Sequence, residues 1–180
     1  MPGDLSSRAA LLALHFLFYS GFALLAQLFT GVHPVFTPVL AILLIWISVV
    51  DIQRFEIPDL AAALLVLTGM VCVYALGLPV LDHLIAAMLW PLLFWAVGVA
   101  YMHWRGFQGL GFGDVKLMVG IGAWLGFGQT TLVVFAAAMA GVLVLLVTNL
   151  IKRKSISDIG TRAVAFGPFL CLSTWVIWIF

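Results

Sequence analysis

Apolar residues form long runs along this chain, and polar residues gather in short stretches between them. Crossing the hydrocarbon of a bilayer takes about 20 residues of helix. The runs cover residues 9–29, 35–50, 60–76, 83–102, 115–127, 131–151 and 164–180. The pattern predicts an all-α, polytopic membrane bundle of about seven transmembrane helices. The first run is too long for the apolar part of a cleaved signal peptide, so we expect a retained span.

Glycine and proline mark the breaks between the runs, as is typical of turns and helix ends. They stand at Gly31 with Pro34, at Pro58, at Gly77 with Pro79, through residues 106–113, and at Gly126 with Gly128. No polar stretch is long enough to form a soluble domain. The sequence therefore predicts one integral membrane domain over residues 1–180.

Composition excludes a soluble fold. Hydrophobic residues make up 65% of the chain and charged residues 8%, whereas a soluble domain carries roughly a quarter charged residues. The lipid bilayer is therefore the expected surrounding. A net charge of +1 gives no strong field for nucleic acid, and we expect no nucleic-acid partner.

The positions of the basic residues predict an orientation. With seven spans, all lysines and arginines fall on the side of the N-terminus, and loops 31–34, 77–82 and 126–129 carry none. Because basic residues gather on the cytoplasmic side of membrane proteins, the N-terminus is predicted to be cytoplasmic. The residues are Arg8, Arg54, Arg105, Lys116, Lys152, Arg153, Lys154 and Arg162.

Two aspartates stand out among the few acidic residues. Asp51 ends an apolar run and Asp114 begins one, and the predicted topology puts both at the cytoplasmic edge. Carboxylates near the membrane are costly and mark functional sites, although either one alone is equally well explained as an interfacial cap. Asp82 precedes the run 83–102 on the other side, where it fits a helix N-cap.

Two converging carboxylates have a specific chemistry. When they lie about 3 Å apart they cannot both ionise easily, so they share a proton. One then takes a proton from water as general base, while the other polarises a peptide carbonyl. Such a pair titrates as a unit, so the two roles are not divided between Asp51 and Asp114. Gly111 and Gly113 either allow close approach of substrate backbone or simply form a loop.

Several blocks of sequence resemble one known family. Residues 111–118 read GFGDVKLM and are similar to the G-x-G-D-x-K-L signature of type IV prepilin leader peptidases. Residues 51–59, DIQRFEIPD, resemble the first aspartate motif of that family. Residues 122–126 and 166–170 resemble further blocks. The resemblance covers about residues 42–180.

The resemblance implies an aspartic endopeptidase of the prokaryotic inner membrane. Such enzymes remove the basic leader from type IV or Flp-type prepilins and pseudopilins, at the cytoplasmic face, during pilus assembly and protein secretion. Asp51 and Asp114 would be the catalytic pair. Lys116 would help bind substrate or tune the pair, or else be a cation that reaches the interface.

The supporting residues of the motifs have simpler explanations as well. Pro58 suits the first turn of the helix over residues 60–76, because its missing N–H would be unpaired there. Asp59 favours the same helix N-terminus, and the alternative for it is substrate binding. Glu56 would meet the basic leader or be a solvated loop charge.

The chain departs from many bacterial members of the family. They carry an N-terminal domain with paired Cys-x-x-Cys motifs and also methylate the new N-terminus, whereas only Cys72 and Cys171 occur here. The resemblance is therefore to a stand-alone peptidase, and methylation is not expected. Both cysteines are predicted to be small buried hydrophobes. Because the histidines are dispersed, we expect no metal and no other cofactor.

Two other functions stay open at this stage. One is a different G-x-G-D membrane protease, such as a preflagellin peptidase. The other is a small proton- or ion-coupled transporter, because acids within membranes also relay protons. Against the transporter, the acids lie at one edge of the membrane rather than near its midplane.

Overall fold

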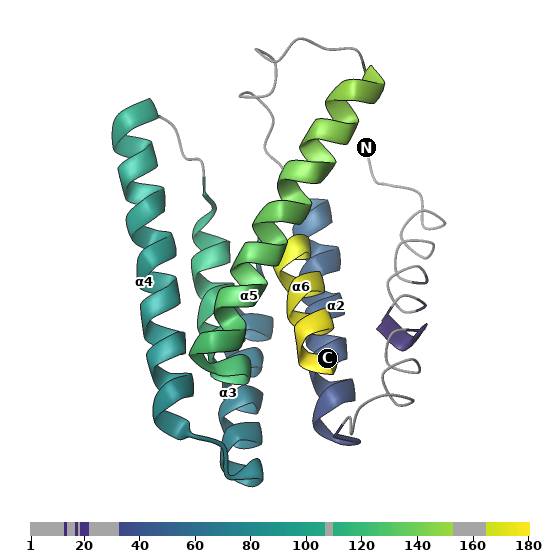
Figure 1. Ribbon diagram of the computed structural model, residues 1–180, viewed down its shortest axis with the longest axis vertical. Coiled ribbons are helices and arrows are strands. Elements are labelled where there is room, and N and C mark those ends of the chain that lie inside the picture. Colours follow the sequence, from purple (N-terminus) through teal and green to yellow (C-terminus); the bar gives the residue numbers. More distant parts are fainter. Residues whose placement is uncertain (1–12, 14–16, 18, 22–32, 107–109, 153–164) are drawn as a thin grey trace.

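The described part of the chain is built from helices packed side by side (Figure 1). The structure is a computed structural model that describes residues 13, 17, 19–21, 33–106, 110–152 and 165–180. Within these ranges there is no strand, so the predicted all-α class is confirmed there. The helices are α2 (Phe36–Arg54), α3 (Asp59–Leu76), α4 (Val80–Arg105), α5 (Phe112–Lys152) and α6 (Gly167–Ile179). Most of the predicted first span, 9–29, lies outside the described residues.

The helices end close to the predicted breaks. Gly77 and Gly106 follow α3 and α4 with φ of 64° and 77°, a left-handed conformation that glycine adopts without steric cost. Phe55 ends α2 in the same region, with φ of 55°. Pro58 stands at the N-cap of α3, one position before the first turn where it was expected.

Two expectations about helix ends are wrong in detail. Helix α2 continues past residue 50 to Arg54, so Asp51 lies within its last turn rather than after it. Asp82 is not the N-cap of α4, because Pro79 occupies that position and Asp82 lies in the first turn. The Asp82 carboxylate instead accepts the backbone N–H of Phe127, at 3.0 Å.

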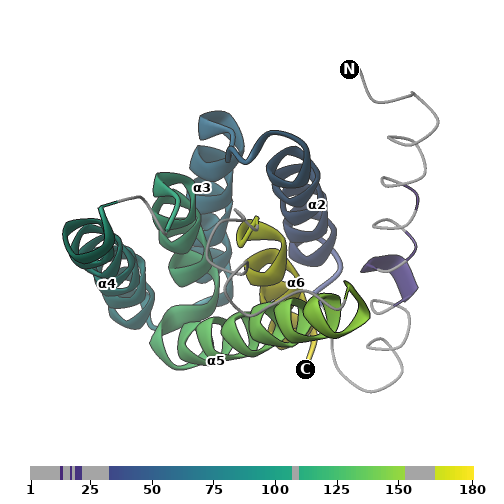
Figure 2. The same ribbon diagram turned by 90° about the horizontal axis from the view of Figure 1, so that it is seen from above.

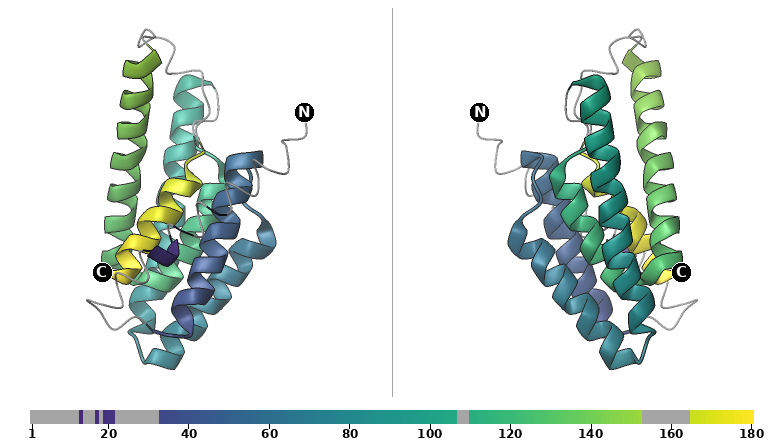
Figure 3. Two further views of the ribbon diagram at one scale, coloured as in Figure 1. Left: turned by 90° about the vertical axis from the view of Figure 1, so that its right-hand side faces the viewer. Right: turned by 90° about the vertical axis from the view of Figure 1, so that its left-hand side faces the viewer.

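Helix α5 contains the predicted spans 115–127 and 131–151, and it changes direction at Gly126. That residue has φ of 73° and ψ of −179°, far from helical values. Figure 1 and Figure 3 show the first part descending beside α3 and the second part rising from the turn. The Thr130 hydroxyl donates to the Gly126 carbonyl oxygen at 2.6 Å. The predicted break is therefore a tight reversal rather than a loop.

Helices α5 and α6 lie at the centre of the packing. Helix α5 contacts α3, α4 and α6, and α6 packs against both α2 and α5 (Figure 2). Gly122 lies so close to α4 that a Cβ atom there would be 2.6 Å from the backbone of Ala86 and Ala87. Small residues allow such approach between membrane helices.

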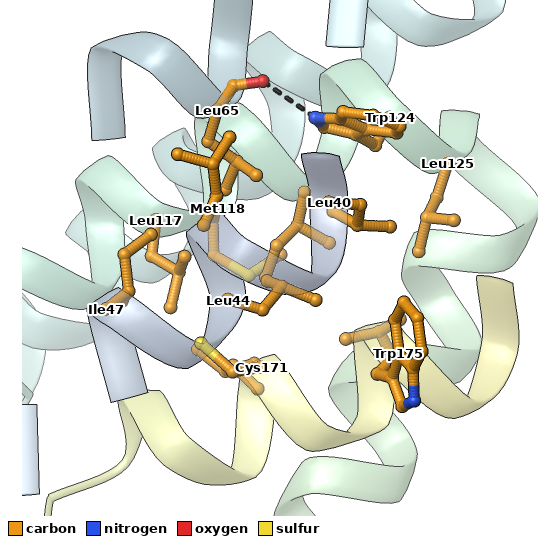
Figure 4. Packing of buried hydrophobic residues seen from close by; sticks show 14 of the residues in the cluster. Leu40, Leu44, Ile47, Leu65, Leu117, Met118, Trp124, Leu125, Cys171 and Trp175 are labelled. Carbon is orange, nitrogen blue, oxygen red and sulfur yellow. Dashed lines mark hydrogen bonds between the residues drawn. The ribbon is translucent and has the colours of Figure 1, made fainter. Parts of the chain in front are cut away.

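The core joins all of these helices through buried side chains, and α4 contributes Phe94 to it (Figure 4). The Trp124 indole N–H donates to the Leu65 carbonyl oxygen at 2.8 Å, which ties α5 to α3. Cys72 and Cys171 are free and buried, as predicted. The core residues labelled in Figure 4 are Leu40, Leu44, Ile47, Leu65, Leu117, Met118, Trp124, Leu125, Cys171 and Trp175.

Four of the described helices are long and apolar enough to cross a membrane. They are α2, α3, α4 and the stretch Phe112–Val147 of α5, whereas the apolar helix α6 is shorter. Each predicted run from 35–50 onward falls on one of the described helices, and two fall on α5. The fold is that of a helical membrane protein.

Candidate active site

Asp51 is held inside the protein. It lies in the last turn of α2, and the residue is only 5% exposed. Its Oδ2 atom accepts the backbone N–H of Gly167, the first residue of α6, at 3.1 Å. A buried carboxylate needs such donors, because burial removes the water that would otherwise solvate it.

Asp114 lies in the first turn of α5 and is 7% exposed. Its backbone N–H donates to the Gly111 carbonyl oxygen at 3.1 Å. A helix N-terminus favours negative charge, so the local fold suits a carboxylate here. The sequence predicts both aspartates at a membrane edge, and in the structure protein atoms cover them.

The fold brings the two aspartates together. Asp114 interacts electrostatically with Asp51, although the two lie on different helices. Cys171 on α6 is fully buried and lies within electrostatic range of both carboxylates. In the part of the chain that the structure describes, neither carboxylate has a lysine or arginine partner. The two acids therefore lie within electrostatic range of each other, without a neutralising cation among the described residues.

The two sequence motifs are joined by further contacts. Lys116 forms an ion pair with Asp59, with 2.5 Å between Nζ and Oδ1. Gly113 lies against Ile57, so that a Cβ atom at position 113 would be 3.2 Å from that side chain. The loop after α2 and the start of α3 therefore lie against the start of α5, on the same side as Asp51 and Asp114.

The glycines of the second motif differ in what they require. At Gly111 a Cβ atom would be 3.5 Å from Asp114 Oδ2, which is ordinary contact. At Gly113 the space is tighter because buried Ile57 fills it. The group that closely approaches Gly113 is thus the Ile57 side chain of the protein itself. Pro58 lies between Ile57 and Asp59 and fixes the entry to α3.

This arrangement supports acid–base chemistry on one substrate atom. When two carboxylates lie close together, ionisation of one disfavours ionisation of the other, so the pair tends to hold one proton between them. The pair then offers a general base and a proton donor side by side. Among the described residues, no group of three His, Cys, Asp or Glu side chains is placed to hold a metal ion.

Sequence reasoning did not assign a role to two residues near this pair. Gly167 donates to Asp51, and Cys171 lies beside both acids. A glycine followed by proline at the start of a helix was a usable signal for Gly167, because proline favours the first turn. For Cys171 the sequence holds no such signal, since its neighbours depend on how α6 packs.

The fold and site together define a class: helical membrane proteins that bury a pair of carboxylates between helices. The particular family follows from sequence comparison. A model of the type IV leader peptidase family matches residues 38–146, a stretch that contains both aspartates, and the chain belongs to this family. Residues 166–170, which resemble a further block, lie beyond the match.

Individual relatives agree with the family. The prepilin leader peptidase/N-methyltransferase of Aeromonas salmonicida is 30% identical over 142 residues, which is 76% of this chain and 47% of that protein. The protein of the same name from Burkholderia pseudomallei is 33% identical and covers 71% of this chain and 40% of its own length.

A third relative of that name, from Escherichia coli K12, is 31% identical and covers 72% of this chain and 56% of its own length. The chain spans about half the length of the curated relatives it matches. No solved structure matches the chain.

Proposed function

We propose that this protein is a prepilin peptidase, an aspartic endopeptidase that removes the leader from type IV or Flp-type prepilins or pseudopilins. The observation that carries the proposal is that Asp51 and Asp114 are both buried and lie within electrostatic range of each other. Membership of the type IV leader peptidase family supports the reaction. The names of the relatives, prepilin leader peptidase/N-methyltransferase, support the substrate class.

In the proposed reaction the aspartate pair acts as a unit. The ionised carboxylate removes a proton from a water molecule, which attacks the carbonyl carbon of the scissile peptide. The shared proton passes to the carbonyl oxygen, and a tetrahedral gem-diol forms. When the C–N bond breaks, the pair returns a proton to the leaving amine. No cofactor or metal takes part in this scheme.

The site is proposed to open on the cytoplasmic face of the inner membrane of a prokaryotic cell. Arg54 and Arg105 lie in the last turns of α2 and α4, and Lys116 lies near the start of α5. Since basic residues favour the cytoplasmic side, their position near the aspartates supports this orientation. The proposal retains about seven spans with a cytoplasmic N-terminus.

The substrate is proposed to meet the site through its basic leader. Glu56, on the loop that follows α2, and Asp59, the first residue of α3, are exposed. Acidic side chains beside the pair complement a positively charged leader and steer it toward the site. The hydrophobic helix of the prepilin would remain in the bilayer beside the peptidase.

Cleavage of a co-expressed Flp-type prepilin, read as a mobility shift, tests this function. Wild type is compared with Asp51→Asn and Asp114→Asn, and each substitution is expected to abolish cleavage because the amide neither accepts nor shares the proton. Asp82→Asn is the matched control, because Asp82 also accepts a backbone N–H but lies beside the turn at Gly126. This control is expected to cleave normally.

Two results would count against the proposal in different ways. If Asp51→Asn and Asp114→Asn both still cleave, the pair is not catalytic. If wild type fails to cleave a panel of prepilins and pseudopilins while it inserts into membranes, the substrate class is wrong. Membrane insertion of every variant is checked by fractionation and immunoblotting.

A further inference from the structure

The amino end of α6 points at Asp51, and its hydrogen bonds can be accounted for residue by residue. Gly167 donates its N–H to Asp51 Oδ2 at 3.1 Å. Pro168 has no N–H to give. Phe169 and Leu170 both donate to the Phe166 carbonyl oxygen, at 3.1 and 3.2 Å. The first turn of α6 therefore directs a single donor, that of Gly167, to the carboxylate.

Glycine at position 167 is explained by space rather than by backbone conformation. Among the described glycines only Gly77, Gly106 and Gly126 have positive φ, so the backbone at Gly167 is open to any residue. A Cβ atom at this position would lie 2.6 Å from Asp51 Oδ2, 3.1 Å from its Cγ and 3.6 Å from its Cβ. The three nearest atoms all belong to Asp51.

The neighbouring charges explain why such a donor is needed. Asp51 lies in the last turn of its own helix, where the helix dipole disfavours an anion. Asp114 on α5 and Cys171 on α6 lie within electrostatic range of Asp51, and neither supplies positive charge. The amino end of α6 offsets both effects, because its partial positive charge and its N–H favour a carboxylate.

We propose that Gly167 is a positioning residue of the peptidase, whose N–H and missing side chain together hold the Asp51 carboxylate toward Asp114. This inference rests on the proposed function of the aspartate pair. In this role the residue acts through Asp51, to which its N–H donates. Its substitution should therefore lower the rate of the chemical step and leave substrate binding intact.

The first measurement is the kinetics of Gly167→Ala with purified full-length protein and a prepilin in detergent. A displaced carboxylate is expected to lower kcat by about 100-fold, as misplacement of a reacting group by about 1 Å does, with KM unchanged. Gly141→Ala is the matched control, because its Cβ would make only ordinary contact, 3.8 Å from Phe166. The inference would be overturned if kcat of Gly167→Ala were unchanged, or if the substitution raised KM without lowering kcat.

The second measurement does not depend on catalysis. Thermal unfolding is compared for wild type, Gly167→Ala, Asp51→Ala and the double variant, which forms a double-mutant cycle. Because the three atoms nearest to the added methyl group all belong to Asp51, the fall in Tm caused by Gly167→Ala is expected to disappear in the Asp51→Ala background. A fall of equal size in both backgrounds would show that the methyl group clashes elsewhere, and the inference fails.

The two measurements distinguish failure of the positioning role of Gly167 from failure of the proposed peptidase function. If wild type does not cleave, the proposed function fails while the unfolding cycle still tests the contact. If wild type cleaves and Gly167→Ala cleaves equally well, the positioning role alone fails. If Gly167→Ala does not fold, folding of the double variant supports the contact, and failure of both variants contradicts it.

Discussion

At each end of the helix bundle a carboxylate accepts a backbone N–H. At one end the donor is at the start of a helix, and at the other end it is beside a turn within a helix. Asp51 accepts from Gly167 at 3.1 Å, and Asp82 accepts from Phe127 at 3.0 Å. In each case a glycine beside the carboxylate leaves no room for a side chain. The local device is the same, but the surroundings differ.

The difference lies in burial and in the second acid. Asp82 is partly exposed, and its bond fastens α4 to the turn of α5. Asp51 is buried and lies within electrostatic range of Asp114. One hydrogen bond thus fastens a turn, while the other holds a carboxylate that we propose to be catalytic. A carboxylate bonded to a helix amino end becomes a candidate catalytic group only when a second titratable group meets it.

The largest expected effect is that of a substitution at Gly122, which lies between the two ends of the bundle. This substitution should lower both stability and cleavage. Gly122→Val would drive a side chain into the backbone of α4 at Ala86 and Ala87. The expected loss is about 3 kcal/mol of unfolding free energy, because a well-packed contact cannot accept extra carbons. Unfolding in detergent measures it, and cleavage should fall in parallel.

Gly128→Val is the control for that prediction, since a Cβ at Gly128 meets nothing within 4 Å. It should be close to wild type in stability. Equal losses for the two variants would mean that close packing of α4 on α5 is not what Gly122 provides.

The next effect concerns Trp124, which lies two residues before the turn. Trp124→Phe removes the N–H donated to the Leu65 carbonyl oxygen and leaves a space in the core. The loss should be about 2 kcal/mol of unfolding free energy, measured by the same unfolding experiment. Because Trp124 stabilises the fold, kcat is expected to stay within about twofold of wild type at a temperature where the variant is folded. A loss of kcat comparable with that of Gly167→Ala would contradict the assignment of a purely structural role to this end of the bundle.

Gly126→Ala sharpens the comparison most directly. Gly126 has φ of 73° and ψ of −179°, a conformation that is essentially confined to glycine and costs another residue about 1–3 kcal/mol. The methyl group would also meet Asp82. Stability should therefore fall while kcat is retained. In an Asp82→Ala background the clash is relieved but the backbone strain remains, so rescue should be only partial. Complete rescue would mean that strain at Gly126 is negligible.

The smallest effect is expected at the ion pair beside the site. Lys116 and Asp59 are 38% and 82% exposed, and exposed ion pairs contribute about 0–1 kcal/mol. Asp59→Asn and Lys116→Met should each change the unfolding free energy by less than about 1 kcal/mol. A double-mutant cycle measures the coupling, and a value well above that limit would show that the pair fastens the two motifs together.

The sequence predicts the helices well because their causes are local. Apolar runs, glycines and prolines are read directly from the chain, so the ends of α3 and α4 agree with prediction to within a few residues. Counting the predicted spans puts Asp51 and Asp114 at the same edge of the membrane, although it does not say that their side chains approach each other. Since that count needs only the order of the runs, it does not depend on detailed packing.

The contacts that could not be predicted from the sequence are those that depend on which helices become neighbours. The bonds of Gly167 to Asp51 and of Phe127 to Asp82 join residues that are far apart in the chain. The ion pair of Lys116 with Asp59 is of the same kind. The reversal at Gly126 was predicted only as a break, because a glycine pattern does not give the angle between two helices.

The turn at Gly126 also bears on how the protein enters the membrane as it is synthesised. Residues 112–125, which carry Asp114, form a segment shorter than the roughly 20 residues that cross the hydrocarbon. The apolar stretch that qualifies as a span runs from Phe112 to Val147 and includes the turn. The short segment is therefore expected to insert as a hairpin with the residues that follow it. Asp114 would then reach its place only after the ribosome has passed about residue 147.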